Sequence, residues 1–415
     1  MTTLRAIASL IAAITILQTA QGLMGVYLPL AMHADGLKGA AIGFVGAMYA
    51  AGFMAGAWFG PTMLARVGHI RVFAASASIV SATTLALYAS SDPISWGVLR
   101  CVMGAAVALV SVAVDSWMSA QVRREERGGV MGVYQVLTKA ALTLGPFLLF
   151  GAVPGAAAPL MLAAALQALA VVPITMTTQP QPDPPRATPL ALRNQFSVAP
   201  AAVTAAFFAG FINTGVMTLA PLYAEANFGA ASAPAFQASA WLGSLLLQWP
   251  AGRLSDRIDR RVVIAALAAL AAVGALALAV FGKLLPFPAA AFLFALWGAG
   301  GLSFYGIATA HMADRAEPGR IAQAASGLLF VWATGSIIGP LVLGVAVEAA
   351  GRAAMFWFAG LSSVGLVAFM VHRRAEREPS EKTTRESVAP QQATSVAASE
   401  LAYGDEEQPP LPLTP

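Results

Sequence analysis

Long apolar stretches recur along nearly the whole chain, and they constrain its fold more than any other feature. A helix needs about 20 apolar residues to cross a hydrocarbon core about 30 Å thick. Twelve stretches are of suitable length, at approximately 6–32, 39–64, 71–91, 94–121, 129–151, 156–177, 197–223, 234–253, 262–282, 286–312, 321–347 and 353–372. Lipid cannot hydrogen-bond a backbone, so stretches of this kind form helices. The sequence predicts an all-α membrane protein with twelve transmembrane helices.

The composition excludes several other classes of protein. With 58% hydrophobic and 11% charged residues, the chain has too little polar surface for a soluble domain. Cys101 is the single cysteine, which excludes a disulfide framework. The four histidines lie near the ends of apolar stretches, and no phosphate-binding loop is present. We therefore expect no metal, no cofactor, no ATP-driven pump and no binding to nucleic acid.

The first apolar stretch has two interpretations. Thr19-Ala20-Gln21 resembles the cleavage site of a secretory signal peptide. The apolar run continues well past this site to Met32, which makes it long enough to cross the membrane. We interpret it as the first transmembrane helix.

The distribution of lysine and arginine predicts the orientation in the membrane. If the N-terminus is cytoplasmic, the inner side carries fourteen basic residues before the C-terminal tail, and the outer side carries Lys38, Lys283 and Arg352. Basic residues favour the cytoplasmic side, so both termini are predicted to be cytoplasmic. Five more basic residues lie in the tail, and the remaining two of the 24, Arg100 and Lys139, fall within the membrane. We expect a multi-pass protein of the bacterial cytoplasmic membrane.

The domain organisation follows from a proline-rich linker. Residues 178–196 include a cluster of prolines around Asp183 and divide the apolar stretches six and six. Residues 1–177 and 197–372 are therefore predicted to form two six-helix bundles, and residues 373–415 a disordered cytoplasmic tail. The halves share landmarks at similar offsets, Arg66 with Arg257 and Gly145-Pro146 with Gly339-Pro340, which suggests parallel repeats.

A short charged motif connects the eighth and ninth stretches. Gly252-x-x-x-Asp256-Arg257-x-x-Arg260-Arg261 resembles the loop between helices eight and nine of the major facilitator superfamily, with Asp259 where that family usually has glycine. The resemblance extends from about Arg5 to His372 and is closest to a YcaD-type bacterial branch. It implies two bundles related by a pseudo-two-fold axis, a central site between them, alternating access and a monomeric carrier.

Arg100 and Lys139 are the main candidates for substrate contact. A charge at the bilayer centre costs at least ~3 kcal/mol, so charged residues there are usually functional. At 1.5 Å per residue, Arg100 lies about 9 Å from the outer face and Lys139 about 16 Å from the inner face, with no carboxylate at that depth. The pair favours an anionic solute. Alternatively, Lys139 extends its amine to the membrane interface. Arg100-x-x-x-Gly104 resembles the helix-four arginine motif of drug:proton antiporters, with Met103 replacing the usual glutamine. By that resemblance, Arg100 would instead serve helix packing or proton coupling.

Uncharged polar residues complete the candidate binding site. They lie in stretches that line the cavity in the resembling family, and each has the alternative role of a hydrogen bond between helices. These candidates are Gln18, Gln21, Tyr134, Gln135, Asn213 and Tyr305.

Four residues are candidates for gating or coupling. Asp115 lies where Arg66 could approach it and close the inner gate, although Ala65 replaces the aspartate usual in the family. Asp256 and Arg257 are the corresponding pair in the second half, with Asp256 capping the fifth helix at residues 128–129. The alternative is that these residues only anchor the loops in the cytoplasm.

These observations predict a function in transport and not in catalysis. We expect a secondary transporter of a small, anionic solute that works in the lipid bilayer, with the proton as a candidate coupling ion. One alternative is a proton-coupled exporter of amphipathic compounds, which Arg100 and Gly145-Pro146 favour. The other is a membrane-embedded enzyme or lipid-handling protein, which would need a cluster of catalytic groups that the sequence does not offer.

Overall fold

The computed structural model describes residues 2–122, 127–149, 155–177, 181–182, 195–317 and 321–376. Within these residues every regular element is a helix. The first half contains α1 (Thr2–Ala34), α2 (Gly39–Val67), α3 (His69–Ala86), α4 (Pro93–Gln121), α5 (Arg127–Leu144), α6 (Ala157–Leu169) and α7 (Val171–Thr175). The second half contains α8 (Gln195–Val198), α9 (Pro200–Phe228), α10 (Ala233–Arg257), α11 (Arg260–Phe281), α12 (Phe287–Gly301), α13 (Phe304–Ala313), α14 (Ile321–Ala350) and α15 (Ala354–Glu376). Short 3₁₀ turns are η1 (Leu87–Ala89), η3 (Gly145–Leu149) and η4 (Ala230–Ser232).

The predicted twelve membrane-crossing segments are confirmed. Among the described residues, ten helices are long and apolar enough to span a bilayer. The other two crossings are α5 with η3, and α10, which carry more polar residues than their neighbours. These two helices contact each other where the halves meet. Protein therefore covers the polar side chains that lipid would not tolerate.

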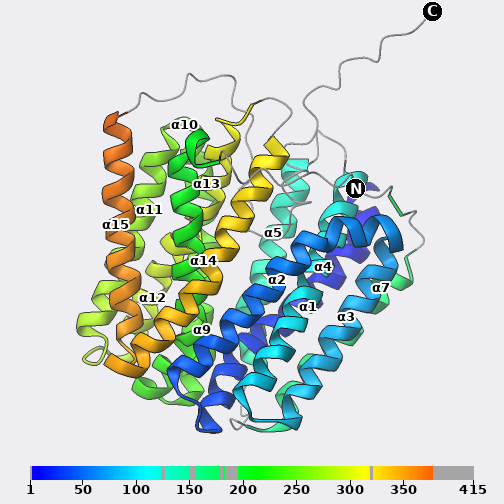
Figure 1. Cartoon of the computed structure of the whole chain (residues 1–415), viewed down its shortest axis with the longest axis horizontal. Coiled ribbons are helices and arrows are strands. Elements are labelled where there is room, and N and C mark those ends of the chain that lie inside the picture. Colours follow the sequence, from blue (N-terminus) through cyan, green and yellow to red (C-terminus); the bar gives the residue numbers. More distant parts are fainter. Residues whose placement is uncertain are drawn as a thin grey trace, which may run out of the picture.

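The two halves lie side by side in Figure 1, coloured blue to cyan and green to orange, and they repeat the same helix pairing. In the first half α1 packs on α5, α2 on α4 and α3 on α6. In the second half the corresponding contacts join α9 with α14, α10 with α12 and α11 with α15. The start of α1 and the end of α15 lie at the same end of the bundle (Figure 1). The fold is that of two six-helix bundles related by a pseudo-two-fold axis.

The tenth crossing is interrupted, which the sequence pattern did not predict. The expected single helix at 286–312 is two helices, α12 and α13, separated at Leu302 and Ser303. Gly298, Gly300 and Gly301 precede the break and weaken the helix, because glycine is a poor helix former. Gly298 is required for packing, since a Cβ there would lie 2.2 Å from the Ala240 carbonyl oxygen. Gly298 therefore allows close packing of α12 against α10, and the break follows at the Gly300-Gly301 pair.

The ends of the predicted domains need one correction. The tail was expected to be disordered from residue 373, but α15 continues to Glu376. An ion pair of 2.6 Å between Arg373 and Glu376 joins adjacent turns there, and Arg261 Nη1 donates to the Arg373 carbonyl at 2.8 Å. The rest of the tail, and most of the linker predicted at 178–196, lie outside the described residues.

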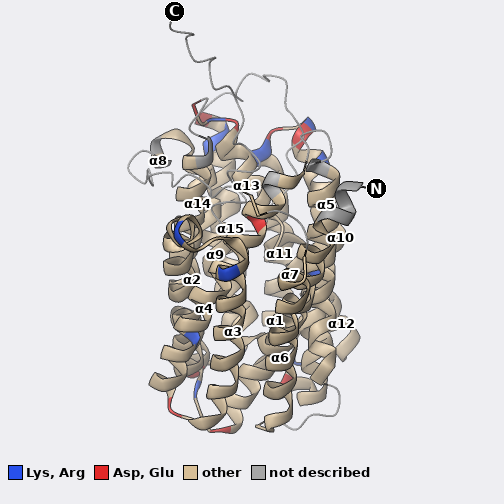
Figure 2. Cartoon of the chain, turned by 90° about the vertical axis from the view of Figure 1, so that its right-hand side faces the viewer, with Lys and Arg blue, Asp and Glu red and all other residues tan. Residues whose placement is uncertain are grey.

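The halves also meet at the end of the bundle opposite the start of α1, which we call the far end. Lys38 Nζ lies 3.9 Å from Glu348 Oε1, and the backbone N–H of Ala40 donates to Glu348 Oε2 at 3.1 Å. His33 Nε2 accepts a hydrogen bond of 2.8 Å from Arg352 and lies 4.0 Å from Glu225. Most of the ribbon in Figure 2 is uncharged, with charged residues near the top and bottom of the molecule and a few at mid-height.

Glycines bring the two halves into backbone contact beside these polar groups. A Cβ on Gly43 of α2 would lie 2.1 Å from the Pro340 carbonyl oxygen of α14, and a Cβ on Gly39 would lie 2.7 Å from the Gly344 carbonyl oxygen. Only a residue without a side chain fits at this distance. The far end is therefore closed by close helix packing together with polar contacts.

Candidate functional site

A cavity of about 370 Å³ lies between the two halves. Its wall is formed by α1, α2, α4 and one residue of α5 from the first half, and by residues of α9, α10, α13 and α14, with Leu302 and Ser303 of the helix break, from the second. Ligand sites in transporters built from repeats lie at such an interface. The cavity is therefore the candidate functional site.

Five of the eight predicted substrate-contacting residues line this cavity. They are Gln18, Gln21, Arg100, Asn213 and Tyr305. The other three, all on α5, do not line it, because the face of α5 that carries them packs against protein. These are Tyr134, Gln135 and Lys139.

Arg100 is the only charged residue in the cavity wall that the structure describes. Its guanidinium lies over the ring of Tyr49, 4.1 Å from the centroid, and its Nη1 approaches Met103 Sδ at 3.0 Å. Its Nε is buried without a hydrogen-bond partner, and no carboxylate of the described residues pairs with it. The guanidinium of Arg100 therefore contacts an aromatic ring and a thioether sulfur, but no carboxylate of the described residues.

Local packing explains why Arg100 sits over Tyr49. Gly104, one helical turn after Arg100, would place a Cβ 2.1 Å from the Tyr49 carbonyl oxygen, so α4 and α2 touch at this level. Tyr49 Oη in turn accepts a hydrogen bond of 3.0 Å from Gln21 Nε2 of α1. Three polar side chains from three helices therefore lie together in the cavity wall. We call this group the Arg100 cluster: Gln21 of α1, Tyr49 of α2 and Arg100 of α4.

Sequence reasoning did not identify Tyr49 as a site residue, although it selected two other tyrosines, Tyr134 and Tyr305. The signal was the spacing Tyr49-x-x-x-Phe53, which places two aromatic side chains on the same face of α2. Phe53 lies 6.2 Å from Trp332 of α14 and Trp332 lies 6.1 Å from Tyr305 of α13, measured between ring centroids. These three rings line the cavity and form a row from the first half to the second, here called the aromatic row.

Polar groups of the second half lie close to the break between α12 and α13. Asn213 Nδ2 donates to the Gly301 carbonyl oxygen at 2.7 Å. The interrupted helix leaves carbonyl groups without their usual partners, and this side chain satisfies one of them. The Oδ1 atom of Asn213 and the Oε1 atom of Gln237 are buried without hydrogen-bond partners. Both residues line the cavity and can accept hydrogen bonds from a solute.

Lys139 lies behind the cavity wall and connects the two halves. It is 1% exposed, and its Nζ lies 2.5 Å from Ser244 Oγ of α10. Ser244 Oγ is also 3.4 Å from Ser303 Oγ and 3.4 Å from the Leu302 carbonyl oxygen at the helix break. Ser303 lines the cavity, so Lys139 is connected to the cavity only through Ser244 and Ser303. The placement differs from the expected direct contact because α10 covers this face of α5.

The four residues predicted to act in gating differ in burial and in their partners. Asp115 is fully buried and accepts a hydrogen bond of 3.1 Å from Tyr134 Oη. Arg66 and Arg257 are exposed, and no ion pair joins Arg66 with Asp115 in the described part of the chain. Asp256 Oδ1 lies 3.6 Å from Arg260 Nη1. A gating role for these four residues stays a prediction.

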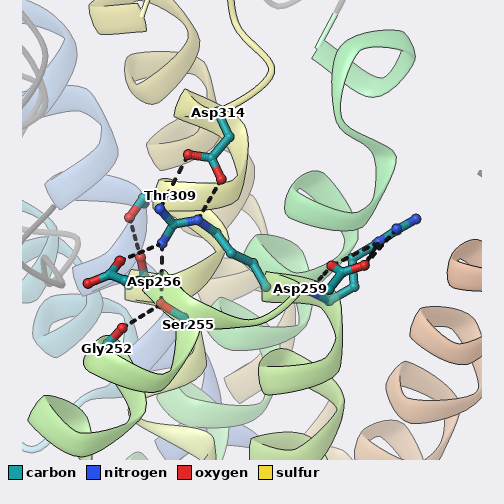
Figure 3. A network of polar contacts seen from close by, with 9 residues as sticks. Gly252, Ser255, Asp256, Asp259, Thr309 and Asp314 are labelled. Carbon is teal, nitrogen blue, oxygen red and sulfur yellow. Dashed lines mark hydrogen bonds and ion pairs between the residues drawn. The ribbon is translucent and has the colours of Figure 1, made fainter. Parts of the chain in front are cut away.

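The charged motif is organised around Arg260, a residue that sequence reasoning treated only as a cytoplasmic cation. Its side chain is 1% exposed, and its Nε and Nη2 donate to Asp314 at 2.6 and 3.3 Å. Its Nη1 donates to Ser255 Oγ at 3.2 Å, as Figure 3 shows. Arg260 therefore connects the end of α10, the start of α11 and the end of α13.

Asp259, which replaces the usual glycine of the motif, caps α11. Its carboxylate accepts hydrogen bonds from the backbone N–H of Arg261 at 2.9 Å and from the Arg261 guanidinium at 2.7 Å. Burial raises the pKa of Asp259, but the hydrogen bonds and the charge of Arg261 outweigh it, so that the pKa lies below its usual value. The departure from the family pattern therefore supplies a helix cap.

Twelve membrane-crossing helices in two repeated halves around a central cavity define a secondary membrane transporter. The chain belongs to the Major Facilitator Superfamily, whose family model matches residues 10–243 and 236–412. This membership places the protein among transporters and not among enzymes.

Relatives and solved structures agree with this classification. The chain is 23% identical over 340 residues to an uncharacterized MFS-type transporter YcaD of Salmonella arizonae, covering 81% of this chain and 87% of the relative. It is 24% identical to the YcaD protein of Salmonella typhimurium over 344 residues, with the same coverage. Its fold is similar to that of a point mutant of the nucleoside transporter NupG, with a TM-score of 0.73, 15% identity and coverage of 88% and 98% of the two chains. It is also similar to a D-xylose-proton symporter, with a TM-score of 0.72, 15% identity and coverage of 89% and 97%.

Proposed function

We propose that this protein carries a small organic anion across the bacterial cytoplasmic membrane by alternating access, as a monomer. The observation that carries the proposal is Arg100, a cation in the wall of the central cavity with no carboxylate partner among the described residues. The basic residues of the loops favour cytoplasmic termini. In that orientation the far end faces outward, and the cavity belongs to a state that is closed to the outside.

Energetics favour an anion as the partner of Arg100. A charge within the membrane costs at least ~3 kcal/mol. The cation–π contact with Tyr49 stabilises the guanidinium by about 0.5–2 kcal/mol, which does not fully offset the cost of placing the charge within the membrane. A carboxylate, phosphate or sulfonate group can accept two parallel hydrogen bonds from a guanidinium, and such pairs are the strongest that this side chain makes. A bound anion would supply the missing counter-charge.

Ligand-induced thermal stabilisation of the purified protein tests this proposal. Organic anions should raise the melting temperature of the wild type, while neutral analogues of the same size should not. Arg100→Gln should abolish the shift. Arg253→Gln is a matched control, since Arg253 lies 3.7 Å from the Trp249 ring centroid in a similar cation–π contact but on an exposed part of α10, and it should retain the shift. Equal shifts in both variants, or shifts with neutral or cationic ligands alone, would overturn the proposal.

Proton coupling is a second candidate property, and Lys139 is the observation that favours it. Its amine is buried between the halves, and no carboxylate of the described residues pairs with it. Ser244 and Ser303 connect it to the cavity wall. A proton released by this amine could accompany or oppose the solute. Uptake into proteoliposomes that responds to a pH gradient in the wild type, but not in Lys139→Met, would support this role; an unchanged response in the variant would reject it.

A further inference from the structure

The cavity wall places aromatic rings directly beside the Arg100 cluster. Tyr49 and Phe53 are four residues apart on α2, which is about 6 Å along the helix axis and on the same face. Arg100 lies over Tyr49, and Phe53 begins the aromatic row that continues through Trp332 to Tyr305. Arg100 thus contacts Tyr49, and the aromatic row begins one helical turn further along the same face of α2.

The aromatic row limits the kind of anion that would fit. At about 370 Å³, the cavity is much larger than a small inorganic anion, which would occupy only the Arg100 end. The rest of the lining combines the aromatic row and aliphatic side chains such as Met24, Leu28 and Ala50 with uncharged polar side chains such as Ser336 and Asn213. Burying an apolar ring against such a wall is favourable at roughly 25 cal/mol per Å².

From this arrangement, and resting on the proposed function, we propose that the solute is an aromatic carboxylate. Its carboxylate group binds at Arg100, and its ring packs against Phe53, Trp332 and Tyr305. Aromatic rings prefer offset or edge-to-face contacts, and the Phe53 and Trp332 rings already meet at 72°. The carboxylate contacts the first half and the ring contacts both halves.

This geometry also gives the solute a way to couple the halves. Arg100 and Phe53 belong to the first half, while Trp332 and Tyr305 belong to the second. A solute that has only a carboxylate group engages one half. A solute with a ring bridges the two halves and favours the state in which they are close.

Binding of three probes by isothermal titration calorimetry tests the inference. Benzoate carries both features, acetate carries only the carboxylate, and benzyl alcohol carries only the ring. Benzoate should bind at least about tenfold more tightly than either of the others, a difference equivalent to about 1.4 kcal/mol. Equal affinity for benzoate and acetate would overturn the aromatic inference.

Variants separate the contribution of the ring from that of the charge. Trp332→Leu should weaken benzoate about tenfold and leave acetate unchanged, whereas Arg100→Gln should weaken both. Trp357→Leu is the control, because Trp357 is 43% exposed on α15 and does not line the cavity. Phe53→Leu provides an independent variant on the other half, so the test does not depend on the folding of one protein. Unchanged benzoate affinity in both Trp332→Leu and Phe53→Leu would refute the inference.

The same measurements distinguish this inference from the proposed function. If acetate and benzoate bind equally and both require Arg100, the anion transporter stands and only the aromatic preference fails. If benzyl alcohol binds as tightly as benzoate and Arg100→Gln changes neither, the anionic solute fails together with the aromatic carboxylate.

Discussion

Replacing Gly43 with alanine should open the far end of the transporter. The new Cβ would lie 2.1 Å from the Pro340 carbonyl oxygen and 3.1 Å from Gly344 Cα, both backbone atoms of α14. Neither atom can move without shifting the helix, so the two halves must separate. Overpacking of this kind costs about 1–3 kcal/mol. The contact joins the halves only while the far end is closed, so the cost falls on that state alone. A cost of about 2 kcal/mol would shift the equilibrium toward the open state by roughly thirtyfold.

Thiol labelling from outside the cell measures this equilibrium. Thr218 lines the cavity, and its Cγ2 lies 2.9 Å from a Cβ placed on Gly46, so it sits where α2 meets α9. In a Cys101→Ala chain, Thr218→Cys should react slowly with a membrane-impermeant maleimide when the far end is closed. Adding Gly43→Ala should raise the labelling rate by about tenfold or more.

Gly56→Ala is the matched control for this experiment. A Cβ at Gly56 would lie 2.3 Å from the Ala105 carbonyl oxygen, a clash of the same kind between α2 and α4 within the first half. It should lower the melting temperature without changing the labelling rate. If both variants raise the labelling rate equally, or if Gly43→Ala lowers the melting temperature and leaves labelling unchanged, the far-end contact does not control access.

Three further predictions concern charged residues. Asp314→Asn should destabilise the protein by about 3 kcal/mol, because it leaves the buried Arg260 guanidinium without its closest carboxylate; denaturation in detergent micelles measures this, and a loss below about 1 kcal/mol would contradict it. Asp259→Asn should lower the melting temperature at neutral pH, because Arg261 holds the pKa of Asp259 below its usual value of 3.8. A group whose pKa is lowered by folding stabilises the protein above its unfolded pKa, and this stabilisation is lost as the pH falls through its folded pKa. The difference in melting temperature between wild type and Asp259→Asn should therefore shrink below pH 3.8. A difference in melting temperature that grows in acid would contradict this argument. Lys139→Met should leave the protein folded by size-exclusion chromatography, because a methionine of similar length can fill the apolar part of the site; aggregation would show that the amine is needed for folding.

Most of the fold could be predicted from the sequence, because the thickness of the lipid bilayer sets the length of apolar sequence that a membrane-spanning helix needs. All twelve crossings were predicted to within several residues, including α5 and α10, which hydropathy alone does not select. The break at Leu302 and Ser303 was missed because glycines within an apolar run are compatible with a continuous helix. Close glycine packing such as that of Gly298 against Ala240 also occurs in the continuous helices, for example at Gly243 of α10, so it does not mark the break either.

The site was harder to predict than the fold. The depth of Arg100 and Lys139 in the membrane follows from counting residues, but the direction in which a side chain points depends on how each helix is rotated. That rotation places Arg100 in the cavity wall and turns Lys139 toward Ser244. Phe53 carries no polar group and Trp332 carries only an indole N–H, so neither stands out as a site residue in a sequence rich in apolar side chains.

The modest hydropathy of α5 and α10 has a consequence for how the chain is made. A segment that is too polar to partition into lipid unaided must remain at the insertion machinery until a neighbouring helix can shield it. For α5 that neighbour, α1, has already been synthesised. Helix α10 contacts α5 and α9, which also precede it, but packs most extensively on α12, which emerges later from the ribosome. We therefore expect α5 to leave the insertion machinery early, and α10 to reach its final packing only after α12 has been translated.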